Sequence, residues 1–429
     1  MRNLAVAHCC AAVVLGAAAH AQDVHVVDWL GNPGSQFLDI QPAVDAAQDG
    51  DLLLVRQGEY GSVVIDGKSL SIVAEVDATV RIGSITVRNI AVDQSVLMRD
   101  IRAVVTSTSY RVMTLEDNQG PLWFEASLFQ PAVIQLPIKA GKADSTDGAV
   151  IRIEHCEAVA LLRCQVSGRE PLPGGIGGTQ ATRAIHAIDS EVALYQCEIE
   201  GGKGVSSDPF VGLTIADGKP GEAAIVLDGG FLFASGTTIR GGSGGDGVVD
   251  ATGCTSGGAG GVGLMLEGTM PKAVLLDTAI AGGSGGVAGA GVCSPGGGGA
   301  SSIVLSGQID QLAGSARWME SYSPIPAGWG TLLTYHGEPG DLVFLMAGWD
   351  AQFLWDPSLS GVWLGLPLTI PFFHGQIPAD GVLLKVVPPP FLLSSDKFLR
   401  FTLQPAFIAT DGSAWLGAAA SVVVLDQGP

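Results

Sequence analysis

A ten-residue motif recurs four times along the middle of the chain. Its copies begin at Ala160, Ala193, Phe233 and Val274, and their sequences are ALLRCQVSGR, ALYQCEIEGG, FASGTTIRGG and VLLDTAIAGG. The starting positions are 33, 40 and 41 residues apart. A repeated motif with spacers of unequal length is typical of one structural unit that is stacked several times while the loop it carries varies. The sequence therefore predicts a solenoid.

Apolar and polar residues alternate inside the motif, on either side of a bend. The corresponding apolar residues of the first two copies are Leu161 and Leu194, Cys164 and Cys197, and Val166 and Ile199. In stacked parallel strands, equivalent residues lie about 4.8 Å apart and form columns of like side chains. Burial of these columns stabilises the fold by about 1.5–3 kcal/mol per large apolar side chain. We expect it to be the main source of stability.

The beginning of the solenoid has a pattern of its own. Residues 40–47 place Ile40, Val44 and Ala47 on one helical face, Asp49-Gly50-Asp51 ends the helix, and a strand follows at 52–55. Together with Gly58-Glu59-Tyr60, this resembles the opening of right-handed parallel β-helix proteins of the pectin-lyase-like superfamily. The resemblance implies an all-β fold over residues 22–313, whose first turn is capped by the short helix.

Glycine-rich excursions follow Gly201-Gly202, Gly241-Gly242 and Gly282-Gly283. Between Gly241 and Gly299, 22 of 59 residues are glycine, which leaves too few side chains for a core. We therefore expect loops that leave one side of the solenoid. Because binding residues often lie on loops of a rigid scaffold, this side is the candidate functional surface, with Asp246 and Asp250 as candidate binding residues.

Composition changes at Gly314. Six of the eight tryptophans lie beyond it, and short apolar segments alternate with Pro/Gly turns, which predicts a small antiparallel β-sandwich over residues 314–429. Exposed indoles stack on sugar rings, so Trp349 and Trp355 are candidate glycan-binding residues. The alternative, which we favour, is that the tryptophans fill the sandwich core or its junction with the solenoid.

The start of the chain and its overall charge indicate export. Residues 1–21 have a basic start, an apolar run and Ala19-His20-Ala21 before Gln22, which is the pattern of a secretory signal peptide. No later segment is apolar for long enough to cross a membrane. With 42 acidic and 22 basic residues, the chain is poorly suited to bind nucleic acid or polyanionic polysaccharides, unless a cation mediates. We expect a secreted or cell-surface protein.

Five cysteines follow the signal segment. Cys254 and Cys293 occupy similar points of the two longest excursions, and we predict that they form a disulfide, consistent with export. Cys164 and Cys197 share a motif position, so they are expected on adjacent turns, within the reach of a disulfide. Either a second disulfide or a pair of buried thiols fits that spacing. Cys156 is expected to stay free.

Enzymes of the superfamily that this chain resembles gather several carboxylates on one face, with a base beside them. We find no such column, because the matched polar positions are Arg163, Gln196, Gly236 and Asp277. Asp144 and Asp147 are better explained by an Asx-rich turn. His155 and His186 fall near equivalent positions but are expected to be solvated, and the histidines show no ligand spacing. We therefore expect no resident metal or cofactor.

Residues 241–248 have the pattern of a calcium-binding nonapeptide, with Asp246 at the acidic position. Tandem copies are needed to hold the ion, and the equivalent excursions have Val287 and Ser206 instead. Calcium stays a minor alternative.

The sequence favours a secreted, non-catalytic β-helix that binds or builds a surface or matrix, with a polysaccharide or cell-surface glycan as the candidate partner. The alternative is a polysaccharide lyase or glycoside hydrolase whose carboxylates come from non-equivalent loops.

Overall fold

The computed structural model describes residues 22–105, 111–131, 148–169, 181–207, 217–250, 253–289, 293–349, 351–365, 371–388 and 397–426. The described residues are all-β apart from one short helix, and most of their strands belong to three long parallel sheets. The signal-like segment and Asp144 and Asp147 lie outside the described residues.

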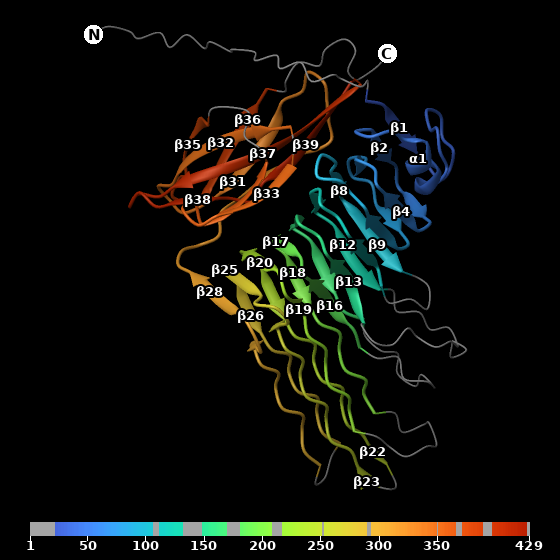
Figure 1. Ribbon diagram of the computed structural model, residues 1–429, viewed down its shortest axis with the longest axis vertical. Coiled ribbons are helices and arrows are strands. Elements are labelled where there is room, and N and C mark those ends of the chain that lie inside the picture. Colours follow the sequence, from blue (N-terminus) through green and yellow to red (C-terminus); the bar gives the residue numbers. More distant parts are fainter. Residues whose placement is uncertain are drawn as a thin grey trace.

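The chain visits the three sheets in turn, so that strands three apart in sequence are usually neighbours. The first sheet contains β1 (Val24–Val27), β2 (Leu52–Val55), β5 (Leu70–Ala74), β8 (Val96–Arg99), β11 (Leu122–Glu125), β14 (Val159–Leu162), β17 (Glu191–Tyr195), β20 (Phe231–Ser235), β25 (Lys272–Leu276) and β28 (Gln308–Leu312). The second contains β3 (Gly58–Tyr60), β6 (Val80–Ile82), β9 (Ile101–Val105), β12 (Leu128–Pro131), β15 (Gln165–Ser167), β18 (Glu198–Glu200), β21 (Thr238–Arg240) and β26 (Ala279–Ala281). The third contains β4 (Val63–Asp66), β7 (Ile85–Arg88), β10 (Met113–Glu116), β13 (Ala149–Glu154), β16 (Arg183–Ile188), β19 (Ile225–Asp228), β24 (Leu264–Glu267) and β27 (Ser302–Val304). We call these three sheets the three-sheet body (Figure 1).

The register of the first sheet confirms the stacking that the repeated motif predicts. The first residues of the four copies pair in order, Ala160 with Ala193, Ala193 with Phe233, and Phe233 with Val274. The next residue of each copy points inward and is buried, as Leu161 and Leu194 are. Side chains from all three sheets meet there in one continuous core. Columns of like residues therefore hold the strands in register.

A helix, α1 (Ile40–Ala46), lies against β1, β2 and β4 at the start of the body. Asp39 caps its first turn by accepting from Ile40 N at 2.7 Å. Ile40, Ala43 and Val44 are buried in the core of the body. At the other end, Lys68 Nζ donates to two free carbonyl oxygens, those of Val44 and Ala47, at 2.7 Å each. The helix thus covers apolar surface of the first strands.

The glycine-rich excursions leave one side of the body, as expected, but they are not separate loops, because they pack against one another as extended segments. Beyond the strands of the second sheet, the chain runs out as extended segments and returns, and the tips lie far from the body (Figure 1). The outgoing segments are 201–207, 241–248 and 282–289, and the returning segments are 217–223, 255–262 and 294–300. We call these six segments the glycine array.

Backbone hydrogen bonds of the glycine array repeat every three residues. The N–H groups of Gly241, Gly244 and Gly247 donate to the outgoing segment that follows, at the carbonyls of residues 281, 284 and 287. The N–H groups of Gly242 and Gly245 donate instead to a returning segment, at Glu222 and Lys219. A three-residue period matches the polyproline II helix, whose backbone groups point outward and are free to bond to neighbours.

Glycine is required because the segments meet backbone to backbone. A Cβ atom on Gly245 would lie 1.9 Å from the carbonyl oxygen of Val205, and one on Gly242 would lie 2.0 Å from that of Gly202. Both distances are far below van der Waals contact. Glycine permits the segments to approach until their backbone groups pair.

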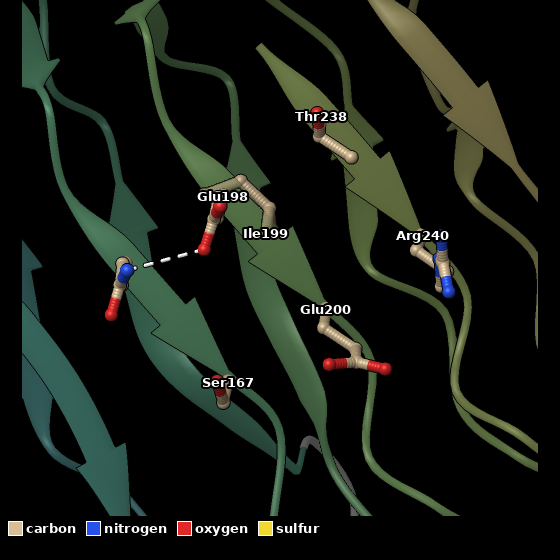
Figure 2. A pocket seen from close by; sticks show the side chains of 7 residues that line it. Ser167, Glu198, Ile199, Glu200, Thr238 and Arg240 are labelled. Carbon is tan, nitrogen blue, oxygen red and sulfur yellow. Dashed lines mark hydrogen bonds between the residues drawn. The ribbon is translucent and has the colours of Figure 1, made fainter.

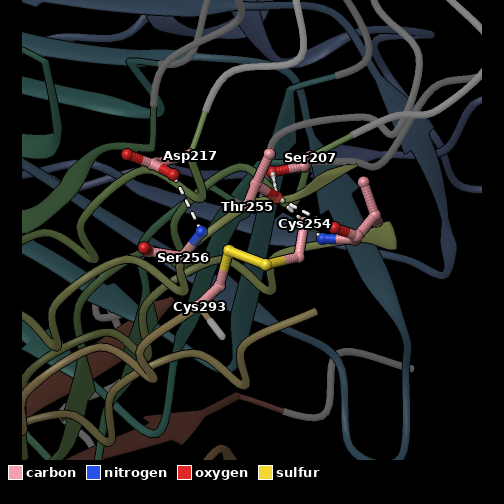
Figure 3. The surroundings of a disulfide bond; sticks show 7 residues. Ser207, Asp217, Cys254, Thr255, Ser256 and Cys293 are labelled. Atoms are coloured by element: carbon pink, nitrogen blue, oxygen red, sulfur yellow. Dashed lines mark hydrogen bonds between the residues drawn. A yellow bond between two sulfur atoms is a disulfide. The ribbon is translucent and has the colours of Figure 1, made fainter. Parts of the chain in front are cut away.

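Two of the described cysteines form a disulfide and three are free thiols. Cys254 and Cys293 form the predicted disulfide between the tips of two excursions, beside Thr255 and the short hairpin of β22 (Val249–Asp250) and β23 (Gly253–Cys254) (Figure 3). The second pairing is wrong: Cys164 and Cys197 are buried free thiols, as is Cys156. Burial raises the pKa of the Cys164 thiol. The buried-thiol alternative and the free Cys156 are confirmed.

Strands β29–β39, here called the C-terminal sheets, are almost all antiparallel. They are β29 (Trp318–Ser321), β30 (Ile325–Pro326), β31 (Thr331–His336), β32 (Leu342–Gly348), β33 (Ala351–Asp356), β34 (Gly361–Gly365), β35 (Phe372–Gln376), β36 (Val382–Val387), β37 (Phe398–Ile408), β38 (Ala414–Leu416) and β39 (Ala420–Leu425). Met319 and Tyr335 of one sheet and Val343, Phe407 and Val422 of another share a buried cluster.

The C-terminal sheets pack on the outer face of the first sheet of the body. Tyr195 and Phe233 of the body are fully buried there, and the ring of Trp355 lies 5.1 Å from that of Phe233. Val362 N donates to the hydroxyl of Tyr195 at 3.1 Å. Trp415 is buried in the same cluster and Trp318 is partly buried against it. For these tryptophans, the junction placement that we favoured is confirmed.

Candidate functional site

A polar hollow lies where the C-terminal sheets meet the body. It has a volume of 480 Å³ and lies between the ends of β8 and β14 and the strands β29 and β31. We call it the junction cleft. Its lining is mostly polar and charged: Glu75, Val76, Asp77, Ala78, Arg99, Asp100, Arg163, Glu320, Ser321, Tyr322, Ser323, Leu332 and Thr334. Junctions between packed units are frequent places for small-molecule sites.

Two of the lining residues, Asp100 and Arg163, lie at sharp bends of the chain, and all four copies of the motif share the bend at the position of Arg163. Arg163, Gln196, Gly236 and Asp277, the matched positions of the motif, all have positive φ, between 48° and 59°. Asp100 has the same conformation, with φ of 58°. The left-handed residue turns the chain from the first sheet to the second. Its side chain therefore lies at the edge of the first sheet, beside the C-terminal sheets.

A buried charge cluster forms the floor of the junction cleft. The carboxylate of Glu125 is fully buried, and its Oε1 accepts from Arg99 Nη1 at 2.7 Å and from Arg163. Its Oε2 accepts from Ser421 N at 3.0 Å and Ser421 Oγ at 2.8 Å, and from the indole of Trp123 at 3.1 Å. Burial alone would raise the pKa of Glu125. The two guanidinium groups and Ser421 outweigh it, and the pKa is lowered.

The same arginines tie the C-terminal sheets to the body. Arg99 donates to the carbonyl oxygens of Ser421 and Ser321, at 2.7 Å each, and Arg163 donates to that of Met319 at 3.1 Å. The Glu125 carboxylate accepts from both arginines and from Ser421, and these charged and polar partners offset the cost of burying it. The cluster fixes the geometry of the cleft.

Asp100 is the titratable group of the cleft with an unusual environment. Its Oδ2 lies 3.2 Å from Arg99 Nε. Burial raises the pKa of Asp100, Arg99 lowers it, the charge of Glu125 raises it further, and the net direction is upward. A carboxyl group with a raised pKa in a cleft can serve as a proton donor or as a neutral hydrogen-bond donor.

The rim of the cleft is open and combines a ring with carboxylates. Tyr322 is 66% exposed, and Glu75, Asp77 and Glu320 line the same hollow. A ring face provides an apolar platform, and carboxylates accept hydrogen bonds from hydroxyl groups. The rim is chemically suited to a neutral, hydroxyl-rich ligand and repels anions.

A second, smaller hollow of 230 Å³ lies on the outer face of β15, β18 and β21 (Figure 2). Glu198 and Glu200 project from β18 and Arg240 from the next strand. Gln165 Nε2 donates to Glu198 at 3.1 Å. No aromatic ring lines this hollow. It is therefore a weaker candidate for sugar binding than the junction cleft.

Asp246 and Asp250 lie in different settings of the glycine array. Asp246 Oδ1 accepts from Val287 N at 2.9 Å, and its Oδ2 lies 3.7 Å from Lys203 Nζ, so the carboxylate joins two neighbouring segments. Asp250 belongs to the β22–β23 hairpin at the tip.

The two tryptophans named from the sequence differ in exposure. Trp355 is partly buried against Phe231 and Phe233. Trp349 is 47% exposed and touches Phe401 with its edge. Neither lines the junction cleft.

Sequence reasoning missed two features. It looked for aspartates at matched positions and found none, and so it overlooked the pairs that involve glutamate: in the third sheet Glu116 pairs with Glu154 and Asp228 with Glu267. Extending the motif upstream into the preceding strand aligns Asp228 with Glu267 only if two extra residues are allowed before the last copy. The junction cleft had no such signal, because Arg99 and Ser321 are 222 residues apart.

No family model matches this chain, and no curated protein matches it. In the part of the chain that the structure describes, no helix has the length and apolar character that crossing a membrane requires.

Proposed function

We propose that this chain is an exported, right-handed parallel β-helix of the pectin-lyase-like type that binds a neutral glycan without cleaving it. Residues 1–21 are its signal peptide, 22–313 the β-helix and 314–429 a C-terminal β-sandwich. Three parallel sheets visited in turn, and a helix over the first strands, support the β-helix. A disulfide between the tips of the glycine array supports an oxidising, extracellular setting.

The observation that carries glycan binding is the exposed ring of Tyr322 beside carboxylates in the junction cleft. A hollow of 480 Å³ is large enough for one or two sugar rings. Glu75, Asp77 and Glu320 can accept from sugar hydroxyls, while the net charge of −20 disfavours acidic glycans. The buried Arg99–Glu125–Arg163 cluster holds the floor in place by hydrogen bonds to both the body and the C-terminal sheets.

A hydrolase is the second candidate, and the raised pKa of Asp100 favours it. Glycoside hydrolysis needs one carboxyl group as acid and a second as base or nucleophile. Asp100 would be the acid, and Asp77 or Glu320, which line the same cleft, would be the second group.

Binding of neutral oligosaccharides, measured by glycan array and then by calorimetry, tests the proposal. Y322A is expected to weaken binding at least tenfold, whereas W349A, which removes an exposed ring outside the cleft, is expected to leave it unchanged. Loss of binding in W349A with no change in Y322A would overturn the cleft. Release of product by the wild type that is abolished in D100N would establish the hydrolase instead.

A further inference from the structure

Three potential metal ligands, none of which lines the junction cleft, lie together on the outer face of the third sheet. His186, Asp228 and Glu267 come from β16, β19 and β24, which are neighbouring strands. One ligand atom of each lies within 4.8 Å of the other two. This cluster contains an imidazole as well as carboxylates.

The register of the sheet brings the three side chains together. Asp228 pairs directly with Glu267, so their side chains leave adjacent strands on the same face. His186 pairs with Val226, two residues before Asp228 on the neighbouring strand, and successive side chains alternate between faces. His186 therefore lies diagonally beside Asp228. The scaffold fixes all three Cα positions, and only side-chain torsions have to adjust to a ligand.

Burial and neighbouring charge are both compatible with a cation. His186 is 7% exposed and Val226 beside it is fully buried, while Asp228 and Glu267 are partly exposed. Arg152 pairs with His186 in register, but its guanidinium contacts Glu154 at 2.8 Å, which offsets the positive charge. The cluster thus keeps two carboxylates for one ion.

We propose that His186, Asp228 and Glu267 bind a divalent transition-metal ion of the zinc class. One imidazole nitrogen with two carboxylate oxygens suits Zn²⁺, whose ligands lie about 2.0–2.2 Å from the ion and hence about 3.4 Å from one another. Rotation of the Asp228 and Glu267 side chains would bring their ligand atoms, which now lie within 4.8 Å of one another and of His186, to that distance. Calcium is disfavoured, because it takes about 6–8 oxygen ligands. The solvent side leaves at least one coordination position for water or a ligand oxygen.

Titration of the untagged protein with Zn²⁺ by calorimetry, and with Co²⁺ by visible absorption, tests the site. We expect one ion per chain, at least a tenfold loss of affinity in H186A and a comparable loss in E267Q, which keeps the shape of the side chain. H155A is the matched control, because His155 contacts a single carboxylate, Asp117, at 3.2 Å on the surface. Circular dichroism and thermal unfolding confirm that each variant folds.

Anomalous diffraction at the zinc edge should place the ion between the three side chains. Equal affinity in H186A and the wild type, or no Zn²⁺ binding by the wild type, would overturn the proposal. A loss of Zn²⁺ affinity in H186A, together with unchanged affinity in E267Q and D228N, would contradict the three-ligand site. Because none of these residues lines the junction cleft, failure here leaves the glycan test unaffected.

Discussion

The three-sheet body and the glycine array continue one into the other, yet they are held together by opposite means. Strands β18, β21 and β26 end at residues 200, 240 and 281, and each runs on into an outgoing segment of the array. Neighbouring segments keep their order across that boundary, since Gly201 N donates to Arg240 O and Gly241 N to Ala281 O. In the body, side chains fill the space between the sheets. In the array, two layers meet without side chains between them.

This contrast shows what limits each packing mode. A side-chain core tolerates variation among apolar residues as long as the total volume is filled, and the column of Leu161, Leu194, Ala234 and Leu275 contains both large and small members. A contact between two backbones tolerates no side chain at all, because even one methyl group would push the neighbouring segments of the array apart. In the array, glycine is therefore a positive structural requirement and not a sign of missing structure.

Leu194→Ala should have the largest effect on the body. Leu194 is fully buried between Leu161 and Ala234, and its removal leaves a cavity that the stacked strands cannot close. We expect a loss of about 4 kcal/mol in the free energy of unfolding. Denaturant unfolding followed by tryptophan fluorescence measures it. A loss below about 1 kcal/mol would show that the columns do not stabilise the body as argued.

Glu125→Ala tests a third means of attachment, the buried charges between the body and the C-terminal sheets. Two arginines would be left without their shared carboxylate, and we expect a loss of about 3 kcal/mol at pH 7. The control E59A removes an exposed partner of Arg81 and should cost less than about 0.5 kcal/mol.

The pH dependence of the Glu125 effect has a definite sign. The pKa of Glu125 is lower in the folded protein than in the unfolded chain. Its contribution is therefore fully present above the unfolded pKa of about 4.3 and is lost as the pH falls through the folded value. The difference in unfolding free energy between wild type and E125A should shrink on acidification below about pH 4. A difference that grows on acidification would contradict the assigned ion pairs.

Removal of the Cys254–Cys293 disulfide should affect the array and leave the body intact. The bond links positions 39 residues apart at the tips of two excursions. We expect the double variant C254S/C293S to lose about 3 kcal/mol, measured as faster amide hydrogen exchange in segments 241–248, 255–262, 282–289 and 294–300 of the array. Exchange in β17 and β20 should not change. If it rises equally there, the array and the body unfold as one unit.

Sequence was a good guide to the body because its side chains repeat. The spacing of Leu161 and Leu194 fixed the register, and the shared position of Cys164 and Cys197 identified adjacent turns, although not their reduced state. The close packing of the array was not predicted, because packing was inferred from the pattern of apolar side chains, and glycine has no side chain. Its signal was the three-residue period of Gly-Gly-Ser-Gly-Gly-Asp from Gly241, which is the period of a polyproline II segment.

The candidate sites depended on contacts that no local pattern contains. Tyr322 reaches the cleft only because the C-terminal sheets pack on the first sheet, and Arg99 meets Ser421 across 322 residues. Pairing of Asp228 with Glu267 was within reach of the sequence, but two extra residues before the last motif copy shifted the alignment.

Gly245→Ala and Gly297→Ala separate close packing from glycine content. A Cβ on Gly245 would lie 1.9 Å from Val205 O, whereas one on Gly297 would meet nothing within 4 Å, and neither residue has a positive φ. We expect G245A to cost about 2 kcal/mol through overpacking, and G297A to change stability by less than about 0.5 kcal/mol. Thermal unfolding and exchange in the array measure both. Equal effects would show that chain flexibility, and not contact, explains the glycines.

Asp246→Ala should have the smallest effect of the series and decides between a structural and a calcium-binding role. Asp246 accepts from Val287 N and lies near Lys203, while the stacked equivalents, Ser206 and Val287, cannot complete an acidic site. Loss of this hydrogen bond should cost about 1 kcal/mol, and D246N, which keeps an acceptor oxygen, should cost less. Millimolar Ca²⁺ or a chelator should leave the melting temperature of the wild type unchanged. A rise with Ca²⁺ that D246N abolishes would make the array an ion-binding element and weaken the contrast with the body.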